Sequence, residues 1–141
     1  MRRSRLQLIQ VAAGVIERSG RYLICQRRDS DTFGGYWEFP GGKRQPGERW
    51  EACLRRELQE ELGVSVRLVA CIGYFRHRYA HRALFLRVFR CAIVKGQPRP
   101  LYPQAMRWVP LRRLARYRFP PANQQLIRQL VCDCERRAVV I

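Results

Sequence analysis

Apolar residues recur along the chain in short runs separated by polar turns, which is the pattern of a strand-rich domain. The segments Leu6–Glu17 and Arg21–Arg28 each predict a strand, and the intervening Ser19-Gly20 predicts the turn of a hairpin. Further strands are predicted at Tyr36–Phe39, Val64–Tyr74, Ala83–Val94 and Ala105–Val109. The stretches at 29–35, 42–48 and 96–103 are rich in Gly or Pro and predict loops. A polar segment lies at 76–82, between two of the predicted strands.

One segment carries a helical period instead. Between Arg49 and Leu62 there is no Gly or Pro, and most residues are strong helix formers, so a helix is predicted. Leu54, Leu58 and Leu62 recur at the helical spacing and form an apolar stripe that can pack on a core. Gly63 is expected to end the helix in the left-handed conformation.

Two further helices are predicted in the last third of the chain. Leu111–Tyr117 predicts a short helix, and Pro121–Glu135 predicts a longer one because Pro is favoured in the first turn. The expected buried face of the longer helix comprises Leu126, Ile127, Leu130 and Val131. This order of elements predicts an α/β fold, with a mixed sheet and helices on both faces. With 141 residues and no repeat or linker, the chain is expected to form a single domain over residues 1–141.

Hydropathy and cysteine usage indicate a cytoplasmic protein. No run of about 18 apolar residues occurs, so no membrane span is predicted, and no apolar signal segment follows the basic Met1–Arg5. Most of the six cysteines stand singly inside apolar runs, where a free Cys acts as a small hydrophobe. No Cys-x-x-Cys occurs, and Cys132 and Cys134 are too closely spaced and too isolated for a zinc site. A reduced, cytoplasmic protein without a membrane partner is therefore expected.

The net charge of +17 is unevenly distributed. Five of the eleven acidic residues fall between Glu48 and Glu61, so the remaining surface must be strongly positive. Such a field attracts polyanions, either nucleotides or nucleic acid. The alternative is a compositional bias toward Arg with no specific partner, because the arginines are scattered rather than gathered in a block. Weak, non-specific binding to nucleic acid is expected from charge alone.

Three carboxylates share one face of the predicted helix. Glu57, Glu60 and Glu61 are spaced at i, i+3 and i+4, close to the negative end of the helix dipole. Arg56 can pair with Glu60 but cannot neutralise all three carboxylates. A hard divalent cation can, and Mg²⁺ prefers oxygen ligands of this kind together with water and substrate phosphates. Taken alone, the spacing also fits a solvated helix face laced with Arg.

The wider spacing resembles the Nudix box at every fixed position. Gly42 is followed after five residues by Glu48, and after seven more by the run Arg56–Val64. The resemblance implies a Nudix hydrolase with an α/β/α sandwich, which splits a nucleoside diphosphate linked to another group using Mg²⁺ or Mn²⁺. It further implies metal ligands at Glu57, Glu60 and Glu61, joined by the carbonyl of Gly42. It assigns Glu48 and Arg56 as supporting residues of the catalytic box.

Two further segments resemble the MutT branch of this family. Trp37–Lys43, which contains Glu38, is similar to the segment before the box, and Phe119–Asn123 is similar to a later motif. In that branch the Asn reads an oxidised guanine base. Asn123 offers a donor and an acceptor, so it can bond a purine edge with both. The alternative is that Asn123 only satisfies the start of a helix, where Asn is favoured.

Two arginines are candidates to hold phosphate. In MutT-like enzymes an Arg near the end of the second strand does so, and a guanidinium fork suits phosphate oxygens. Arg27 and Arg28 both stand at this strand end, and the spacing to Glu38 favours Arg28 without excluding Arg27. The alternative is that both belong to an exposed strand end.

Two observations bear on the catalytic base. His77 and His81 are the only histidines, and a metal-bound water needs no His base, so a catalytic His pair is not expected. Many MutT-like proteins carry a Glu in the loop that corresponds to 101–104, but this chain has no acid between Glu61 and Asp133. The box must then supply the base, with Glu60 or Glu61 expected in that role.

These observations predict a Mg²⁺-dependent nucleoside triphosphate pyrophosphohydrolase, acting on an oxidised purine nucleotide such as 8-oxo-dGTP to give the monophosphate and pyrophosphate. One alternative is a non-catalytic module that recognises oxidised guanine in DNA. The stretch Arg76–His81 resembles the MutT-like domain at the end of adenine glycosylases, which supports that reading, whereas the intact box opposes it. The other alternative is a Nudix hydrolase of another nucleotide, such as a pyrimidine triphosphate. A monomer and a homodimer both remain open.

Overall fold

The computed structural model describes residues 6–139, with side chains through residue 137. The basic Met1–Arg5, where no targeting peptide is expected, lies outside this part of the chain. The strands are β1 (Gln7–Arg18), β2 (Arg21–Gln26), β3 (Trp37–Glu38), β4 (Gly41–Lys43), β5 (Ser65–Arg78), β6 (Arg82–Lys95) and β7 (Ala105–Pro110). The helices are α1 (Trp50–Leu62), the 3₁₀ helix η1 (Leu111–Arg116) and α2 (Pro121–Val139). Within the described residues, no helix is both long and apolar enough to cross a membrane.

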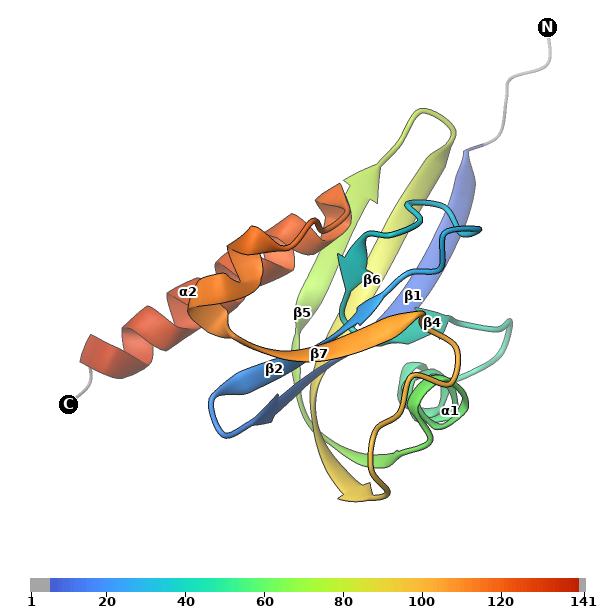
Figure 1. Ribbon diagram of the computed structural model, residues 1–141. Helices are drawn as coiled ribbons and strands as arrows, with labels where there is room; N and C mark the ends of the chain where they lie inside the picture. The colour runs from blue at the N-terminus through green and yellow to red at the C-terminus, as the bar shows by residue number, and fades with distance from the viewer. Residues whose placement is uncertain (1–5, 140–141) are drawn as a thin grey trace, which may run out of the picture.

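The strands form a mixed sheet in the order β3-β2-β1-β6-β5, with β4 on β1 and β7 on β2. β1 and β6 are parallel, and every other pair is antiparallel. The expected hairpin forms between β1 and β2, with Glu17 opposite Tyr22. β1 is long enough to join the two halves of the sheet, one formed by β4, β5 and β6 and the other by β2, β3 and β7. It pairs with β4 and β6 over residues 7–16 and with β2 only at its end. The expected mixed sheet is confirmed (Figure 1).

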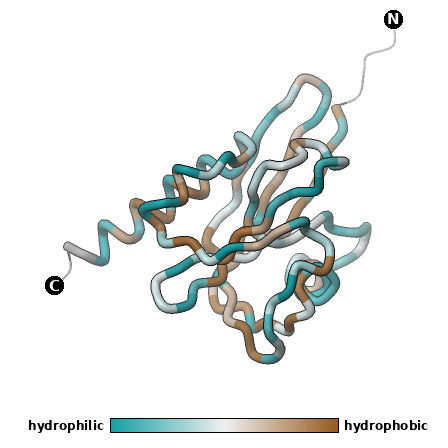
Figure 2. The backbone as a smooth tube through the Cα atoms, in the orientation of Figure 1, coloured by the Kyte–Doolittle hydropathy of each residue, from teal (hydrophilic) through white to brown (hydrophobic). Residues whose placement is uncertain are grey.

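Each face of the sheet has its own core because neighbouring residues of β1 point in opposite directions. Ala12 and Ile16 pack with the leucines of α1, whereas Ala13 and Val15 belong to the cluster that contains Leu126 of α2. The two α-helices therefore lie on opposite faces of the sheet (Figure 1). Hydrophobic segments gather where the strands cross at the centre, and hydrophilic ones follow the loops (Figure 2).

α1 confirms the helix predicted from the apolar stripe. It begins at Trp50, one residue later than expected, and Leu54, Leu58 and Leu62 are all 0% exposed. Gly63 ends the helix in the left-handed conformation at φ 70° and ψ 27°, and its N–H donates to the carbonyl of Gln59. The stripe thus fixes which face of α1 is buried, and the acidic residues are left at the edge of that face.

Several boundaries differ from the sequence-based expectations. The expected loop at 42–48 begins later, because Gly42 and Lys43 belong to the strand β4. This strand lies so close to β1 that a Cβ on Gly41 would collide with the carbonyl of Ala12. The polar segment 76–82 is mostly strand, because β5 and β6 extend through it as a hairpin. Its polar residues are compatible with a strand because β5 is an edge strand whose side chains alternate between buried Phe75 and exposed Arg76.

Two expectations about burial were wrong in part. Val131 is 37% exposed, so it does not share the buried face of α2 with Leu126, Ile127 and Leu130. Cys25, Cys53 and Cys91 are buried as small hydrophobes, whereas Cys71, Cys132 and Cys134 are exposed. The exposed positions belong to the edge strand β5 and the outer face of α2, where an apolar neighbour in sequence does not ensure burial.

Candidate active site

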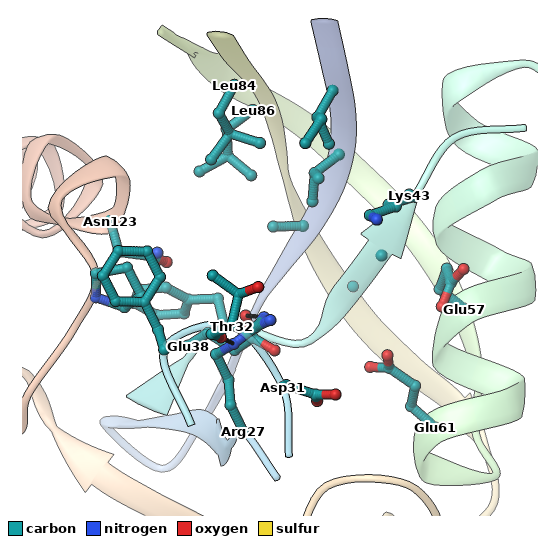
Figure 3. A pocket seen from close by; sticks show the side chains of 18 of the residues that line it. Arg27, Asp31, Thr32, Glu38, Lys43, Glu57, Glu61, Leu84, Leu86 and Asn123 are labelled. Atoms are coloured by element: carbon teal, nitrogen blue, oxygen red, sulfur yellow. Dashed lines mark hydrogen bonds and ion pairs between the residues drawn. The ribbon is translucent and has the colours of Figure 1, made fainter. Parts of the chain in front are cut away.

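A cavity of about 730 Å³ opens between the two halves of the sheet. Figure 3 shows Glu57 and Glu61 of α1 on one side and Asn123 of α2 on the other. Leu84 and Leu86 of β6 form part of the apolar wall between these two ends. The cavity therefore has a carboxylate end and an amide end, joined by apolar surface.

Arg56 lies outside the cavity and holds the residues of the carboxylate end in place through hydrogen bonds. Its Nε donates to Glu48 Oε2 at 2.7 Å, and its Nη1 donates to Glu57 Oε1 at 2.9 Å and to Glu60 Oε2 at 3.3 Å. Its Nη2 donates to the carbonyl of Lys43 at 3.1 Å, which ties α1 to β4. The Arg56 guanidinium and the N–H of Gln45 lower the pKa of Glu48 to about 2. Neither Arg56 nor Glu48 lines the cavity, so both are placed to position the residues that do.

The three box carboxylates Glu57, Glu60 and Glu61 all line the cavity, as the helical spacing predicts. Burial, together with the charges of Glu38 and Glu57, raises the pKa of Glu61 to about 8. Gly42 lies directly against the carboxylate of Glu57, and a Cβ at this position would overlap it. Only glycine leaves room for this contact, so Gly42 allows β4 to lie directly against the Glu57 carboxylate of α1.

The three carboxylates expected to bind the metal do not converge on one point in this structure. Within residues 6–137, no three His, Cys, Asp or Glu side chains lie close enough together to hold a metal ion as they stand. The carboxylates repel one another, and Arg56 draws Glu57 and Glu60 toward its own guanidinium. The carbonyl oxygen of Gly42, the fourth expected ligand, faces the Cys53 thiol at 3.6 Å.

The donor set nevertheless fits a hard divalent cation. The acidic residues that line the cavity are Asp31, Glu38, Glu57, Glu60 and Glu61, and the basic residues are Arg27, Lys43 and Arg82. The cavity is thus more acidic than basic, in a chain whose net charge is +17. A polyphosphate cannot enter favourably unless cations offset this charge, and oxygen donors are the ligands that Mg²⁺ prefers.

Asn123 occupies the opposite end of the cavity and is the only buried polar residue among those described, at 9% exposure. It is the third residue of α2, and its backbone N–H donates to the carbonyl of Pro120 at 3.0 Å. Within the described residues its amide side chain makes no hydrogen bond, so it does not cap the helix. Phe119 does not line the cavity, but it stacks on Phe39, which does, with ring centroids 5.7 Å apart.

The structure places Arg27, rather than Arg28, at the cavity. The Nη1 of Arg27 pairs with Glu38 Oε2 at 2.7 Å, and its Nε donates to the carbonyl of Thr32 at 2.6 Å. Arg28 does not line the cavity and instead lies over the ring of Tyr102, 4.8 Å from its centroid. Two successive residues after a strand point in different directions, which spacing alone did not resolve.

The loop at 101–104 contributes no acid, but it packs beside one. Tyr102 lines the cavity, and its hydroxyl donates to Asp31 Oδ1 at 3.3 Å. Asp31 also lines the cavity, and Figure 3 shows it between Arg27 and Glu61. Sequence reasoning missed Asp31 because it belongs to a different loop, far from the box along the chain.

Other cavity residues were also missed. Lys43 directly follows the two glycines of β4, which was the one signal in the sequence that could have identified it. Phe33 and Tyr79 come from separate loops and meet with ring centroids 5.9 Å apart at the cavity. His77 and His81 do not line the cavity, and the absence of a catalytic His pair stays a prediction.

Comparison with known proteins gives consistent matches over nearly the whole chain. A family model described as "NUDIX domain" matches residues 11–129. The CTP pyrophosphohydrolase of Escherichia coli is 30% identical over 122 residues, which cover 86% of this chain and 90% of that protein. The 8-oxo-dGTP diphosphatase of Haemophilus influenzae is 34% identical over 126 residues, covering 89% and 93%.

Solved structures match the fold over a similar length. The E. coli ORF135 protein superposes with a TM-score of 0.78 at 29% identity, over 90% of this chain and 91% of that one. The MutT protein of Methanosarcina mazei superposes with a TM-score of 0.82 at 21% identity, over 91% and 96%. The second likeness concerns the fold alone.

Proposed function

The chain belongs to the NUDIX domain family and is a Nudix hydrolase, and from this premise we propose that it is a Mg²⁺- or Mn²⁺-dependent pyrophosphohydrolase of oxidised purine nucleoside triphosphates such as 8-oxo-dGTP. Water would attack a phosphorus of the triphosphate and break the bond between the α- and β-phosphates. The products would be the nucleoside monophosphate and pyrophosphate.

One observation carries this proposal: a single cavity holds the box carboxylates at one end and an unpaired buried amide at the other. Its volume of about 730 Å³ lies within the range of sites that enclose a small molecule. A nucleoside triphosphate has the matching polarity, with charge at one end and a hydrogen-bonding base at the other. The apolar wall between them suits the ribose and the face of the base.

Glu57, Glu60, Glu61 and the carbonyl of Gly42 are the groups proposed to hold the metal. A bound divalent ion neutralises phosphate charge and lowers the pKa of a coordinated water. Arg56 and Glu48 keep the carboxylates in position through the bonds described above. Of the three basic residues that line the cavity, Lys43 and Arg27 are proposed to contact phosphate oxygens. Either Glu60 or Glu61 is proposed to take the proton from water.

The amide end supports an oxidised purine as substrate. Asn123 has no partner within the described protein, so its donor and acceptor are both available to a base edge. A second candidate substrate is a pyrimidine triphosphate, because a CTP pyrophosphohydrolase covers most of this chain at 30% identity. The DNA-reader alternative gains no support from the cavity, since recognition of a base needs no cluster of carboxylates at the far end.

We also infer a reducing, cytoplasmic location, because all six cysteines are free and three of them are exposed.

The test is a turnover screen with Mg²⁺ over 8-oxo-dGTP, dGTP, CTP and dCTP, with separate detection of pyrophosphate and orthophosphate. We expect 8-oxo-dGTP to give the highest kcat/KM and pyrophosphate to be the product. Glu60→Gln should lower kcat by about two orders of magnitude or more. Glu51→Gln, on the same helix but outside the cavity, is the matched control and should retain activity.

Preference for CTP over 8-oxo-dGTP would replace the purine assignment with the pyrimidine one. Near-normal turnover by Glu60→Gln, or orthophosphate as the only product, would overturn the assigned chemistry.

A further inference from the structure

Arginines and aromatic residues alternate on the face of the sheet that points away from the cavity. On β6, Leu84 and Leu86 line the cavity, so Phe85 and Arg87 must point to the opposite face. Arg87 lies opposite Tyr74 of the edge strand β5, and Phe85 lies opposite Arg76. This set is here called the arginine–aromatic face, and it consists of Arg44, Trp50, Tyr74, Arg76, Phe85 and Arg87.

The guanidinium groups of this face are stacked on rings. Arg87 lies over Tyr74 at 4.9 Å from the ring centroid and over Trp50 at 5.9 Å. Arg44 lies over Trp50 at 5.2 Å, and Arg76 lies over Phe85 at 5.3 Å. Aromatic contact orients each guanidinium while leaving its charge in place.

No carboxylate neutralises these arginines within the described residues. Arg44 donates to the side-chain oxygen of Gln10 and to the carbonyl of Glu48, and both acceptors are uncharged. The Nε of Arg87 is buried and has no hydrogen-bond partner among the described residues. The three positive charges are therefore not offset by a carboxylate of the described chain, and the exposed Arg76 presents its charge to solvent.

The face is not covered by the rest of the fold. α1 begins at Trp50 and runs away from it, so the helix covers only the neighbouring part of the sheet. Tyr74 is 65% exposed, and Leu8 on β1 is 63% exposed. Arg76 is exposed as well. The ring of Tyr74 and the charge of Arg76 can thus meet a partner directly, with the other four residues of the face half-buried beside them.

The surroundings specify the charge of that partner. Residues 65–95, which include both strands of the β5–β6 hairpin, contain no acid. Of their seven basic residues, Arg82 lines the cavity and Arg90 pairs with Glu17, and the others carry no carboxylate partner within the described residues. A second copy of this chain would bring arginine against arginine, which is unfavourable. A polyanion is complementary, and one with exposed flat bases also matches the rings.

We propose that the arginine–aromatic face binds single-stranded nucleic acid without sequence preference. Arginines contact the phosphates, while bases stack on the exposed ring of Tyr74 and on the guanidinium planes. A duplex presents its phosphates but hides the faces of its bases, so the single strand is the better match. Three of the scattered arginines become one surface because two strands, β5 and β6, and the loop after β4 bring them together.

The experiment measures binding of a fluorescein-labelled oligothymidylate of roughly 20 nucleotides, longer than a usual single-strand site, by fluorescence anisotropy. Tyr74→Leu removes the ring but keeps apolar area, and we expect it to weaken binding by about fivefold or more. Tyr74→Phe keeps the ring and should bind like the wild type. Arg76→Gln should also weaken binding by about fivefold, whereas Arg112→Gln, an equal charge loss on exposed η1, should change it by less than about twofold.

Nucleotide hydrolysis serves as the independent readout. Tyr74, Arg76 and Arg112 do not line the cavity, so all four variants should hydrolyse nucleotides as the wild type does. A loss of oligonucleotide binding with unchanged hydrolysis supports the face whatever the preferred nucleotide proves to be.

Three results would overturn the proposal. Equal losses in Arg76→Gln and Arg112→Gln would show binding through net charge alone. Equal affinity of Tyr74→Leu and wild type would show that no base stacks there. A Tyr74-dependent dimer in sedimentation, with no oligonucleotide bound, would assign the face to a second copy of the chain.

Discussion

Glu61→Gln is expected to stabilise the metal-free protein while removing its activity. Burial, together with the charges of Glu38 and Glu57, raises the pKa of Glu61 from 4.5 to about 8. Because the folded-state pKa is the higher one, the folded protein holds this proton more tightly than the unfolded chain does. The stability that Glu61 contributes is therefore complete below about pH 4.5 and is lost as the pH rises through about 8.

The size of this loss follows from the gap between the two pKa values. At ~1.4 kcal/mol per pH unit, the full window gives an upper bound of roughly 4–5 kcal/mol. Glu61 keeps some contact with solvent at the cavity wall, so we reduce this bound to about 1–2 kcal/mol. For a chain of this length, that corresponds to a difference in Tm of roughly 2–8 °C between Glu61→Gln and wild type.

The assay is thermal unfolding in the presence of a chelator at a series of pH values from about 5 to about 8.5. The Tm of wild type should fall relative to that of Glu61→Gln as the pH rises. Added Mg²⁺ should raise the Tm of wild type, most strongly at the alkaline end, and should raise that of Glu61→Gln less. Glu51→Gln removes a carboxylate of the same helix outside the cavity and should follow the pH dependence of wild type.

Parallel curves for wild type and Glu61→Gln would refute this reasoning, because Glu61 would then titrate alike in the folded and unfolded chain. The same conclusion would follow if Glu51→Gln diverged from wild type as strongly as Glu61→Gln. Retained turnover in Glu61→Gln would separately remove it from the metal site.

Three further predictions concern other parts of the cavity and the core. Asn123→Ala should lower the kcat/KM ratio of 8-oxo-dGTP to dGTP by about tenfold, because a buried base edge loses hydrogen-bond partners worth about 1–3 kcal/mol. An unchanged ratio would contradict base reading by this residue. Asp31→Asn should lower kcat/KM by about tenfold or more, because its carboxylate lies at the metal end of the cavity, and wild-type kinetics would contradict that role. Leu58→Ala should reduce the free energy of unfolding by about 2–5 kcal/mol in chemical denaturation, because Leu58 is 0% exposed and its truncation leaves a cavity in the core. A loss below about 1 kcal/mol would contradict its place in the core.

The sequence determined the features that depend on local spacing. α1, its leucine stripe and its glycine cap follow from the helical period and from the conformational freedom of Gly63. The placement of Glu57, Glu60 and Glu61 on one side of that helix follows from the same period. The mixed sheet was also predictable, because the order of strands and helices restricts how the layers can pack.

Boundaries were predicted less well where tertiary pairing overrides local preference. Gly42 and Lys43 belong to a stretch whose composition predicts a loop, but pairing with β1 makes them strand. The polar segment 76–82 separates two predicted strands, yet β5 and β6 extend into it, because an edge strand needs only one buried side chain in two. Pairing energy comes from the partner strand, which a local pattern does not contain.

Only the tertiary structure decided which distant residues share a surface. Asp31 and Tyr102 meet at the cavity although they lie in separate loops, and Arg27 rather than Arg28 lines it because of the direction in which the chain leaves β2. Three of the arginines that look scattered along the chain share the arginine–aromatic face, where antiparallel pairing sets Tyr74 opposite Arg87. A sequence specifies spacing within one element, whereas proximity between elements depends on strand register and on which face of the sheet each side chain takes.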